Sequence, residues 1–344
     1  MRSVVSVFLA LVLAFPASSA QAAVGLTEIP GVAGDGPVTV FYPSSGEAEA
    51  LRRGPFTLQV APQGPVERGN ARLVVISHGS GGSPWPQSDL ARELVNAGFI
   101  VALPQHKGDN HRDDRHPGPD SWTMRPAEVS RTIDAVAADA RFAPLLALDR
   151  VGMYGMSAGG HTALSLAGGR WSPAAFAKHC DAHLAEEFHA CVGLTTRLTG
   201  GWADGIKLVA AHLVIRWRFD DATPRAHHDP RIAAVVAGVP AAADFDMASL
   251  VTPRVPLGLI TARQDRWLMP RFHSDRVLAA CLPRCELLAD MPHGGHGALL
   301  SPLVPGLDGL IGDLLNDPPG FDRAAVIPDV NRAISAFFRR HLLP

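Results

Sequence analysis

The sequence has little net charge, no internal repeat and no low-complexity tract. It carries 31 Lys and Arg against 33 Asp and Glu, which gives a formal net charge of −2. This balance offers no electrostatic reason to expect nucleic acid or an anionic membrane as a partner. Of the 344 residues, 47% are hydrophobic and 19% are charged. The composition therefore predicts a globular protein with a sizeable core.

Long hydrophobic runs are also missing, with one exception at the N-terminus. Met1-Arg2 is followed by an apolar run from Val4 to Phe15, and small residues ending in Ala22 come next. This order predicts a secretory signal peptide over residues 1–22 and export to the periplasm or the medium. The run is shorter than the roughly 20 residues of a spanning helix. We therefore expect no stable membrane insertion after cleavage, and the alternative is a retained anchor.

The four cysteines form two pairs that are close in sequence, Cys180 with Cys191 and Cys281 with Cys285. In an exported protein an even number of cysteines favours disulfides, and proximity favours these two pairings. A zinc site is the alternative for the first pair, because three histidines lie within residues 179–191. Their spacing matches no common zinc module. We therefore expect two disulfides and no metal.

Short apolar runs alternate with helix-like segments, which is typical of a mostly parallel sheet flanked by helices. Residues 168–228 break this alternation, and we expect them to form a disulfide-bearing cap on the rim of the sheet. The prediction is a single α/β domain over residues 23–344 with this one insertion. We expect strands at 38–42, 56–61, 72–77, 99–103, 151–154, 232–239, 255–261 and 285–288, and helices at 87–96, 126–140, from 157 onward, and 327–343.

A G-x-S-x-G pattern, Gly155-Met156-Ser157-Ala158-Gly159, carries the strongest chemical signal. It follows the apolar run 151–154 and precedes the helical stretch 161–166. This is the strand–turn–helix context of a nucleophile elbow, in which a sharp turn lifts the serine to the open end of the sheet. The glycines avoid clashes with the neighbouring strand and helix. The alternative is a glycine-rich helix start with a capping serine, and the context favours Ser157 as a nucleophile.

A glycine-rich loop, His78-Gly79-Ser80-Gly81-Gly82, follows the apolar run 72–77. Acyl transfer needs two preorganised N–H donors that stabilise the oxyanion of the tetrahedral intermediate. One donor comes from the residue after the nucleophile, Ala158, and the other from this loop, where we assign it to Ser80. A phosphate-binding loop is excluded because no Gly-Lys-Ser/Thr follows. His78 is expected to hold the loop, and an ordinary βα turn is the alternative.

An acid and a histidine should follow the serine in that order. Asp265 lies just beyond the apolar run 255–261, where the fold places the acid, and His296 lies in the glycine-rich stretch 294–297 after the last expected strand. His293 is the competing base. The competing acids are Asp244, Asp246 and Asp290. We predict a triad of Ser157, His296 and Asp265.

With these elements the chain resembles the dienelactone-hydrolase-like branch of α/β-hydrolases, close to bacterial homologues of platelet-activating-factor acetylhydrolase. The resemblance runs from about Val38 to Pro302. It implies the α/β-hydrolase fold, a triad on the three residues above, and hydrolysis of esters without a metal or cofactor. Dienelactone hydrolases proper use a cysteine nucleophile, whereas this chain has Ser157. The matching stretches are residues 77–82 (SHGSGG), 104–108 (PQHKG), 155–164 (GMSAGGHTAL) and 294–297 (GGHG).

The sequence therefore predicts an exported serine hydrolase that acts on small carboxylic esters. An amidase, a peptidase or a polyester hydrolase would use the same triad, and a non-catalytic binding protein is the alternative from another class. Trp171, Trp202 and Trp217 in the cap are candidates for lining an acyl pocket or for packing. The sequence gives no oligomeric state.

Overall fold

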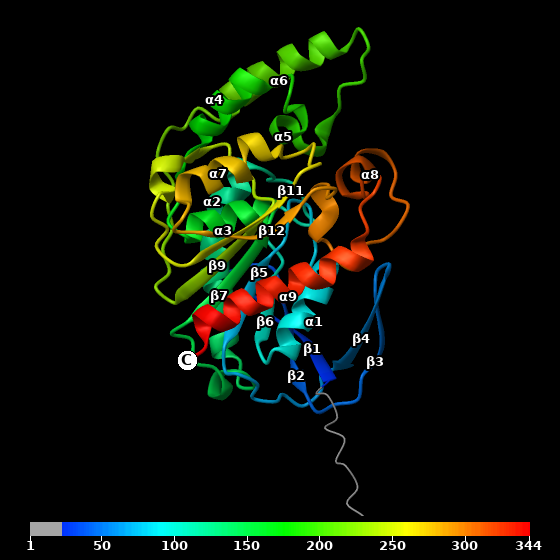
Figure 1. The fold of residues 1–344 in the computed structure, drawn as a ribbon, viewed down its shortest axis with the longest axis vertical. Helices are drawn as coiled ribbons and strands as arrows, with labels where there is room; N and C mark the ends of the chain where they lie inside the picture. The colour runs from blue at the N-terminus through cyan, green and yellow to red at the C-terminus, as the bar shows by residue number, and fades with distance from the viewer. Residues whose placement is uncertain (1–22) are drawn as a thin grey trace, which may run out of the picture.

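The computed structural model describes residues 23–344, and the expected signal peptide lies outside the described residues. A ten-stranded sheet runs through this part of the chain in the order β12-β11-β9-β7-β5-β6-β2-β1-β4-β3 (Figure 1). The strands are β1 (Ala23–Ile29), β2 (Val38–Ser44), β3 (Glu49–Arg53), β4 (Phe56–Pro62), β5 (Leu73–Ser77), β6 (Ile100–Pro104), β7 (Val151–Met156), β9 (Ile232–Gly238), β11 (Leu257–Ala262) and β12 (Glu286–Met291).

The six strands from β12 to β6 are parallel to their neighbours, and β2 continues the sheet antiparallel to β6. Strand β5 is buried along its whole length, as expected for a central strand covered on both faces. Because side chains alternate across a strand, Leu73 and Val75 join one core, whereas Val74 and Ile76 join the other. The sheet therefore separates two hydrophobic layers.

Helices cover both layers. α2 (Pro119–Ala138), α3 (Ala158–Leu166) and α7 (Ser274–Cys281) contribute to the first core, while α1 (Ser88–Asn96) and α9 (Arg323–Leu342) contribute to the second. A short helix, α8 (Gly309–Leu315), precedes α9. No helix within residues 23–344 combines the length and apolarity that are needed to cross a membrane.

The cap expected at residues 168–228 lies beyond the edge where the parallel strands end, at the top of Figure 1. Its short strand β8 (Arg170–Trp171) pairs with β10 (Phe245–Asp246), which follows β9. The Cys180–Cys191 disulfide joins two of its helices, and Cys281–Cys285 is the second disulfide, so both expected pairings are confirmed. The cap helices are α4 (Pro173–His183), α5 (Phe188–Val192) and α6 (Asp204–Arg218).

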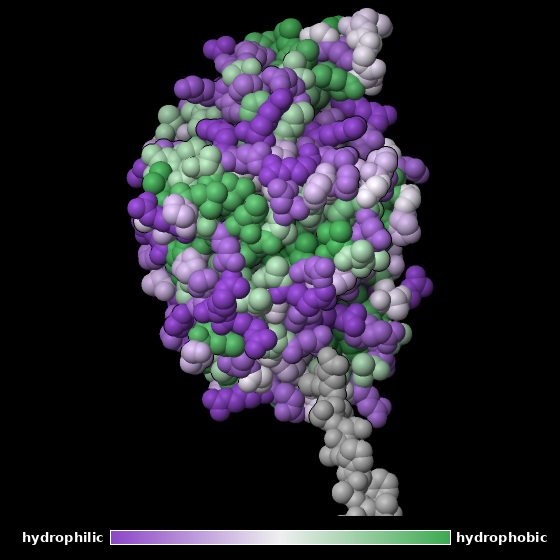
Figure 2. Space-filling model, in the orientation of Figure 1, coloured by the Kyte–Doolittle hydropathy of each residue, from purple (hydrophilic) through white to green (hydrophobic). Residues whose placement is uncertain are grey.

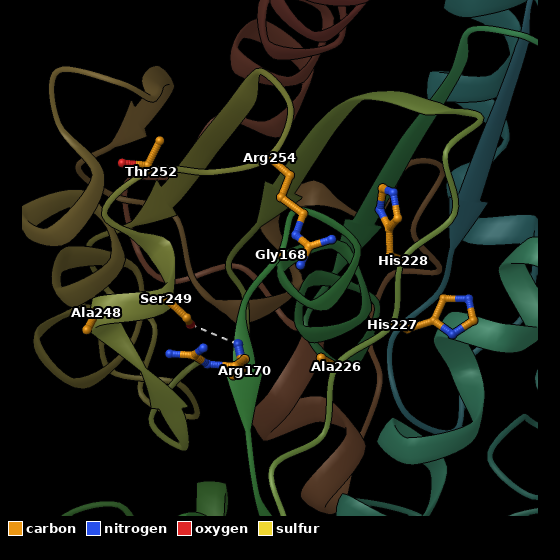
Figure 3. A pocket seen from close by; sticks show the side chains of 9 residues that line it. All are labelled: Gly168, Arg170, Ala226, His227, His228, Ala248, Ser249, Thr252 and Arg254. Atoms are coloured by element: carbon orange, nitrogen blue, oxygen red, sulfur yellow. Dashed lines mark hydrogen bonds between the residues drawn. The ribbon is translucent and has the colours of Figure 1, made fainter.

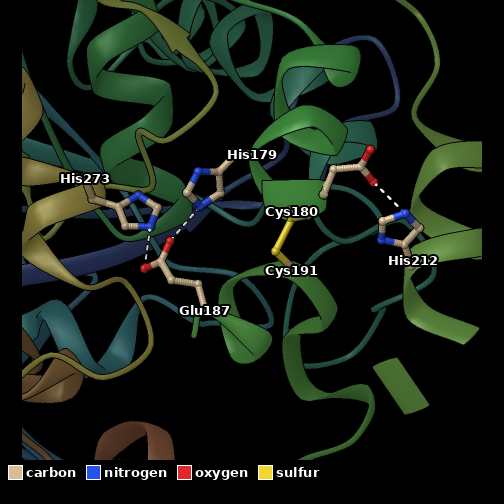
Figure 4. Close-up of a disulfide and its surroundings, with 7 residues drawn as sticks. His179, Cys180, Glu187, Cys191, His212 and His273 are labelled. Carbon is tan, nitrogen blue, oxygen red and sulfur yellow. Dashed lines mark hydrogen bonds and ion pairs between the residues drawn. A yellow bond between two sulfur atoms is a disulfide. The ribbon is translucent and has the colours of Figure 1, made fainter. Parts of the chain in front are cut away.

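Oxidation of Cys180 and Cys191 removes both sulfurs as thiolate ligands of zinc. No group of three or more His, Cys, Asp or Glu in the described residues is arranged to hold a metal ion. Glu187 contacts the rest of the protein instead. It accepts hydrogen bonds from the backbone N–H of Met269 and from His179 and lies beside His273 (Figure 4). These contacts fasten the cap to the loop after β11.

The helix expected at residues 126–140 begins earlier, at Pro119, so Pro126 lies inside it. Pro119 occupies the first turn, where a missing N–H costs nothing. The added turns bury Trp122 and Arg125. Burial therefore extends the helix past a proline that the sequence pattern treats as a start signal.

Candidate active site

Ser157 occupies a sharp turn between β7 and α3. Its backbone has φ +58° and ψ −118°, a conformation that is rare for a residue other than glycine. A Cβ added at Gly155 would lie 1.9 Å from the carbonyl oxygen of Gly159, and one added at Gly159 would lie 2.0 Å from the carbonyl oxygen of Ser77. Only glycine fits at these two positions. The strained turn has the geometry of a nucleophile elbow.

The structure brings Ser157, His296 and Asp265 together. The Ser157 Oγ lies 3.0 Å from the His296 Nε2, and the His296 Nδ1 lies 2.8 Å from the Asp265 Oδ2. When Nδ1–H donates to the carboxylate, Nε2 is free to accept the hydroxyl proton of the serine. The backbone N–H groups of Trp267 and Leu268 both donate to the other carboxylate oxygen, at 2.8 Å each. This arrangement fixes the carboxylate that orients the imidazole.

The competing acids and base have other partners. Asp244 forms an ion pair with His161 at 3.0 Å. Asp246 pairs with Arg170 at 2.9 Å, and Asp290 pairs with Arg263 at 2.7 Å. His293 is exposed and lies beside Gln264, with its Nδ1 3.4 Å from the side-chain amide nitrogen. Within residues 23–344, the side chains of these four residues form no hydrogen bond with Ser157.

The glycine-rich loop 78–82 lies directly against the serine. A Cβ added at Gly79 would be 3.4 Å from the Ser157 Cβ and 3.8 Å from its Oγ. Among residues 23–344, the backbone N–H groups of Ser80 and Ala158 have no hydrogen-bond acceptor. One of these groups follows Gly79 and the other follows Ser157 in the chain, and an oxyanion hole requires two such free donors near the serine.

His78 holds the loop and makes no contact with Ser157 Oγ. Its Nδ1 donates to the carbonyl oxygen of Gly79 at 2.7 Å, and its Nε2 accepts from the backbone N–H of His106 at 3.3 Å. Burial, together with His106 and Arg125, keeps the pKa of His78 well below its usual range. A neutral ring with both nitrogens engaged is suited to holding the loop.

A buried ion pair behind this loop was not predicted from the sequence. Arg125 and Asp109 are both fully buried and lie 2.7 Å apart. Arg125 also donates to the carbonyl oxygen of His78, while Asp109 accepts from the Ser80 hydroxyl at 2.6 Å and from the Gly81 N–H at 2.8 Å. The only signal in the sequence is the position of Asp109, directly after the stretch 104–108 that carries the family resemblance. The pair therefore fixes the backbone of the loop from behind.

The charge of Asp109 is stabilised by its surroundings. Burial alone would raise its pKa, but Arg125 and the hydroxyls of Ser121 and Ser80 outweigh this effect and lower the pKa to about 2. Removing either member of the ion pair would leave an unpaired buried charge, which costs about 3–5 kcal/mol. Ser80 is exposed and is the milder point at which to test the contact.

We expect Ser80→Ala to lower kcat by several-fold to about tenfold with little change in KM, because a loosened loop weakens one N–H donor without removing it. Steady-state kinetics on p-nitrophenyl acetate measures both constants. Ser130→Ala is the matched control, since Ser130 lies on α2 and its hydroxyl bonds the side chain of His227, away from the loop. A rise in KM at unchanged kcat would show instead that Ser80 contributes to ground-state binding.

A second Ser–His–acid chain, Ser77–His106–Glu128, lies near the loop. The Ser77 Oγ is 2.7 Å from the His106 Nε2, and the His106 Nδ1 is 2.5 Å from a Glu128 oxygen. All three side chains are buried. Burial raises the pKa of Glu128, whereas burial and Arg125 keep that of His106 well below its usual range. Without contact to solvent, Ser77 is not placed to meet a substrate.

A groove of about 380 Å³ lies elsewhere on the surface (Figure 3). It is lined by Gly168, just past the C-terminal end of α3, and by Arg170, His228 and Arg254. Ser157 precedes the N-terminal end of the same helix. The length of α3, on the order of 14 Å, therefore separates the groove from the serine.

Comparisons with known proteins bear on the fold. No family model and no curated protein matches the sequence. Among solved structures, a ferulic acid esterase from Streptomyces cinnamoneus is similar with a TM-score of 0.60 and 16% sequence identity, over 96% of this chain and 92% of that one. At this identity the likeness concerns the fold alone. The predicted α/β-hydrolase fold, with a mostly parallel sheet and a disulfide-bearing cap, is confirmed.

Proposed function

We propose that the protein is an exported serine hydrolase that cleaves carboxylic esters through an acyl-enzyme intermediate. The observation that carries this proposal is the continuous relay from Ser157 through His296 to Asp265, built on a strained elbow. The free N–H groups of Ser80 and Ala158 support it. A strained turn, a base and oxyanion donors at one serine fit a catalytic role. A binding protein needs none of these three features.

In the first half of the proposed reaction, Ser157 Oγ attacks the ester carbonyl carbon while His296 Nε2 accepts the hydroxyl proton. The carbonyl oxygen becomes an oxyanion, and the N–H groups of Ser80 and Ala158 donate to it. As the intermediate collapses, the bond between the carbonyl carbon and the alcohol oxygen breaks. His296 returns the proton to that oxygen, and the alcohol leaves.

In the second half, water replaces the alcohol. His296 Nε2 takes a proton from the water as its oxygen attacks the acyl carbon, and the same N–H pair stabilises the second oxyanion. Collapse breaks the bond to Ser157 Oγ, which regains its proton from His296, and the acid is released. The fixed carboxylate of Asp265 stabilises the imidazolium in both halves.

We further propose a single-domain hydrolase of the dienelactone-hydrolase-like branch, cleaved after residue 22. The motifs at residues 77–82, 104–108, 155–164 and 294–297 support the branch. The two disulfides support an oxidising compartment, the periplasm or the medium, because disulfides persist there.

A panel of p-nitrophenyl esters of rising acyl length, beside the matching p-nitroanilides, tests the reaction class. We expect kcat/KM to be higher for the ester than for the anilide at every chain length, since the ester presents the better leaving group to the same triad. Release of p-nitrophenol and p-nitroaniline is followed by absorbance. Faster anilide cleavage would assign an amidase, and cleavage of neither series would contradict the proposal.

A further inference from the structure

The cap helix α6 is apolar on two opposite faces. One face packs against the cap interior through Leu208, Ala211 and Ile215. The opposite face has no covering element in the described residues, and Trp202 extends it just before the helix begins. We call this face the outer stripe. Its members are Trp202 (88% exposed), Ile206 (62%), Val209 (62%), Leu213 (63%) and Trp217 (81%).

The position of α6 leaves the outer stripe open to solvent. It is the outermost helix of the cap in Figure 1, and Figure 2 shows hydrophobic residues at the same end of the molecule. The two tryptophans alone expose roughly 300 Å². A typical monomer has a largest apolar patch of roughly 300–600 Å² in all. A helix that is apolar on both faces is normally covered on both.

The charges of α6 do not favour an anionic partner. Lys207 pairs with Asp204 at 2.9 Å, Arg218 pairs with Asp120 at 2.5 Å, and Arg216 lies 3.8 Å from Asp181. Each cation therefore has a carboxylate of the same chain beside it. The outer stripe presents a nearly neutral apolar surface, which fits another apolar surface better than a charged one.

Two pairs of residues in the outer stripe are placed symmetrically in the sequence. The midpoint between Trp202 and Trp217 in the sequence falls between positions 209 and 210. The midpoint between Ile206 and Leu213 falls at the same place. Four of the five members are therefore paired by this symmetry, while Val209 maps onto Ala210, and such an arrangement is self-complementary about a two-fold axis. In an antiparallel pair of α6 helices, Trp202 faces the partner subunit's Trp217, and Ile206 faces the partner subunit's Leu213.

We propose that a second copy of this chain covers the outer stripe, through antiparallel packing of α6 on the α6 of its partner. Two stripes would together bury on the order of 1,200 Å², the lower end of the range for stable specific interfaces. The two copies of Arg216 lie about 20 Å apart along the pair, since thirteen residue positions separate them along the shared axis. These two guanidinium groups therefore do not meet.

The two-fold axis gives a specific test by sedimentation velocity of the full chain at micromolar concentration. Wild type should sediment with the mass of two chains. Ile206→Glu alone and Leu213→Lys alone should each weaken the dimer by at least about tenfold, because each places two unpaired charges in an apolar interface. An equimolar mixture of the two variants should dimerise again. In the mixed dimer the carboxylate introduced at position 206 of one subunit faces the ammonium introduced at position 213 of the other. The second contact between positions 206 and 213 keeps its native isoleucine and leucine and stays apolar.

Ile311→Glu is the matched control, because Ile311 is a 42% exposed apolar residue on α8, outside the stripe, and its variant should remain dimeric. Circular dichroism verifies that each variant is folded. Wild type that stays monomeric overturns the proposal, and flotation of such a monomer with phosphatidylcholine vesicles assigns the stripe to a lipid surface instead. A mixture that stays monomeric while wild type dimerises overturns the antiparallel arrangement.

Discussion

Ser157→Ala is expected to lower kcat for ester hydrolysis by on the order of 10⁶-fold, because it removes the proposed nucleophile, on which the other members of the proposed triad act. The fold should be unchanged, since alanine has the same backbone preferences as serine at this strained turn and Ser157 lies at the surface end of the sheet. Steady-state kinetics on p-nitrophenyl acetate measures the loss, and thermal unfolding monitors the fold.

Ser77→Ala is the informative comparison, because Ser77 has the same kind of hydrogen-bonded histidine and acid but is buried. It should retain kcat within about an order of magnitude of wild type, since its loss removes a single internal hydrogen bond. If Ser157→Ala kept more than a few per cent of the activity, the serine would not be the nucleophile.

His296→Ala should be as damaging as the serine variant, again on the order of 10⁶-fold in kcat, because a triad acts as a unit. His293→Ala should change kcat by less than about twofold, since an exposed side chain away from special contacts affects little. The two variants differ by three positions in one loop, which makes the comparison well matched. Activities that ranked in the opposite order would assign the base to His293 and require the loop to rearrange.

The elbow was predictable because local constraints determine it. Close backbone contacts require glycine at positions 155 and 159, and this requirement is visible in the sequence as the G-x-S-x-G pattern. The order of serine, acid and histidine follows from strand order, so the positions of Asp265 and His296 beyond β11 and β12 could be expected. The parallel strands inside the sheet were found for a similar reason, since buried strands are continuous apolar runs, whereas the edge strand β12 is mostly exposed or half-buried.

The ion pair of Arg125 and Asp109 was missed because it depends on tertiary structure. Neither residue differs in sequence from a solvated charge, and only burial beside the loop distinguishes them. Strand β3 was missed because its side chains are mostly exposed, and its pairing with β4 maintains it. Of the candidate pocket tryptophans, Trp171 packs against Trp122 and His161, whereas Trp202 and Trp217 point to solvent.

Labelling with a fluorophosphonate probe followed by peptide mapping tests the central claim most directly. The probe reacts with a serine only where a base and an oxyanion hole activate it, so it separates a hydrolase from a binding protein of the same fold. We expect one adduct, on the peptide that contains Ser157, with loss of activity in proportion to labelling and no adduct in Ser157→Ala. Loss of activity on treatment with the probe while Ser157 stays unmodified, or an adduct on another serine, would contradict the assignment of Ser157 as the nucleophile.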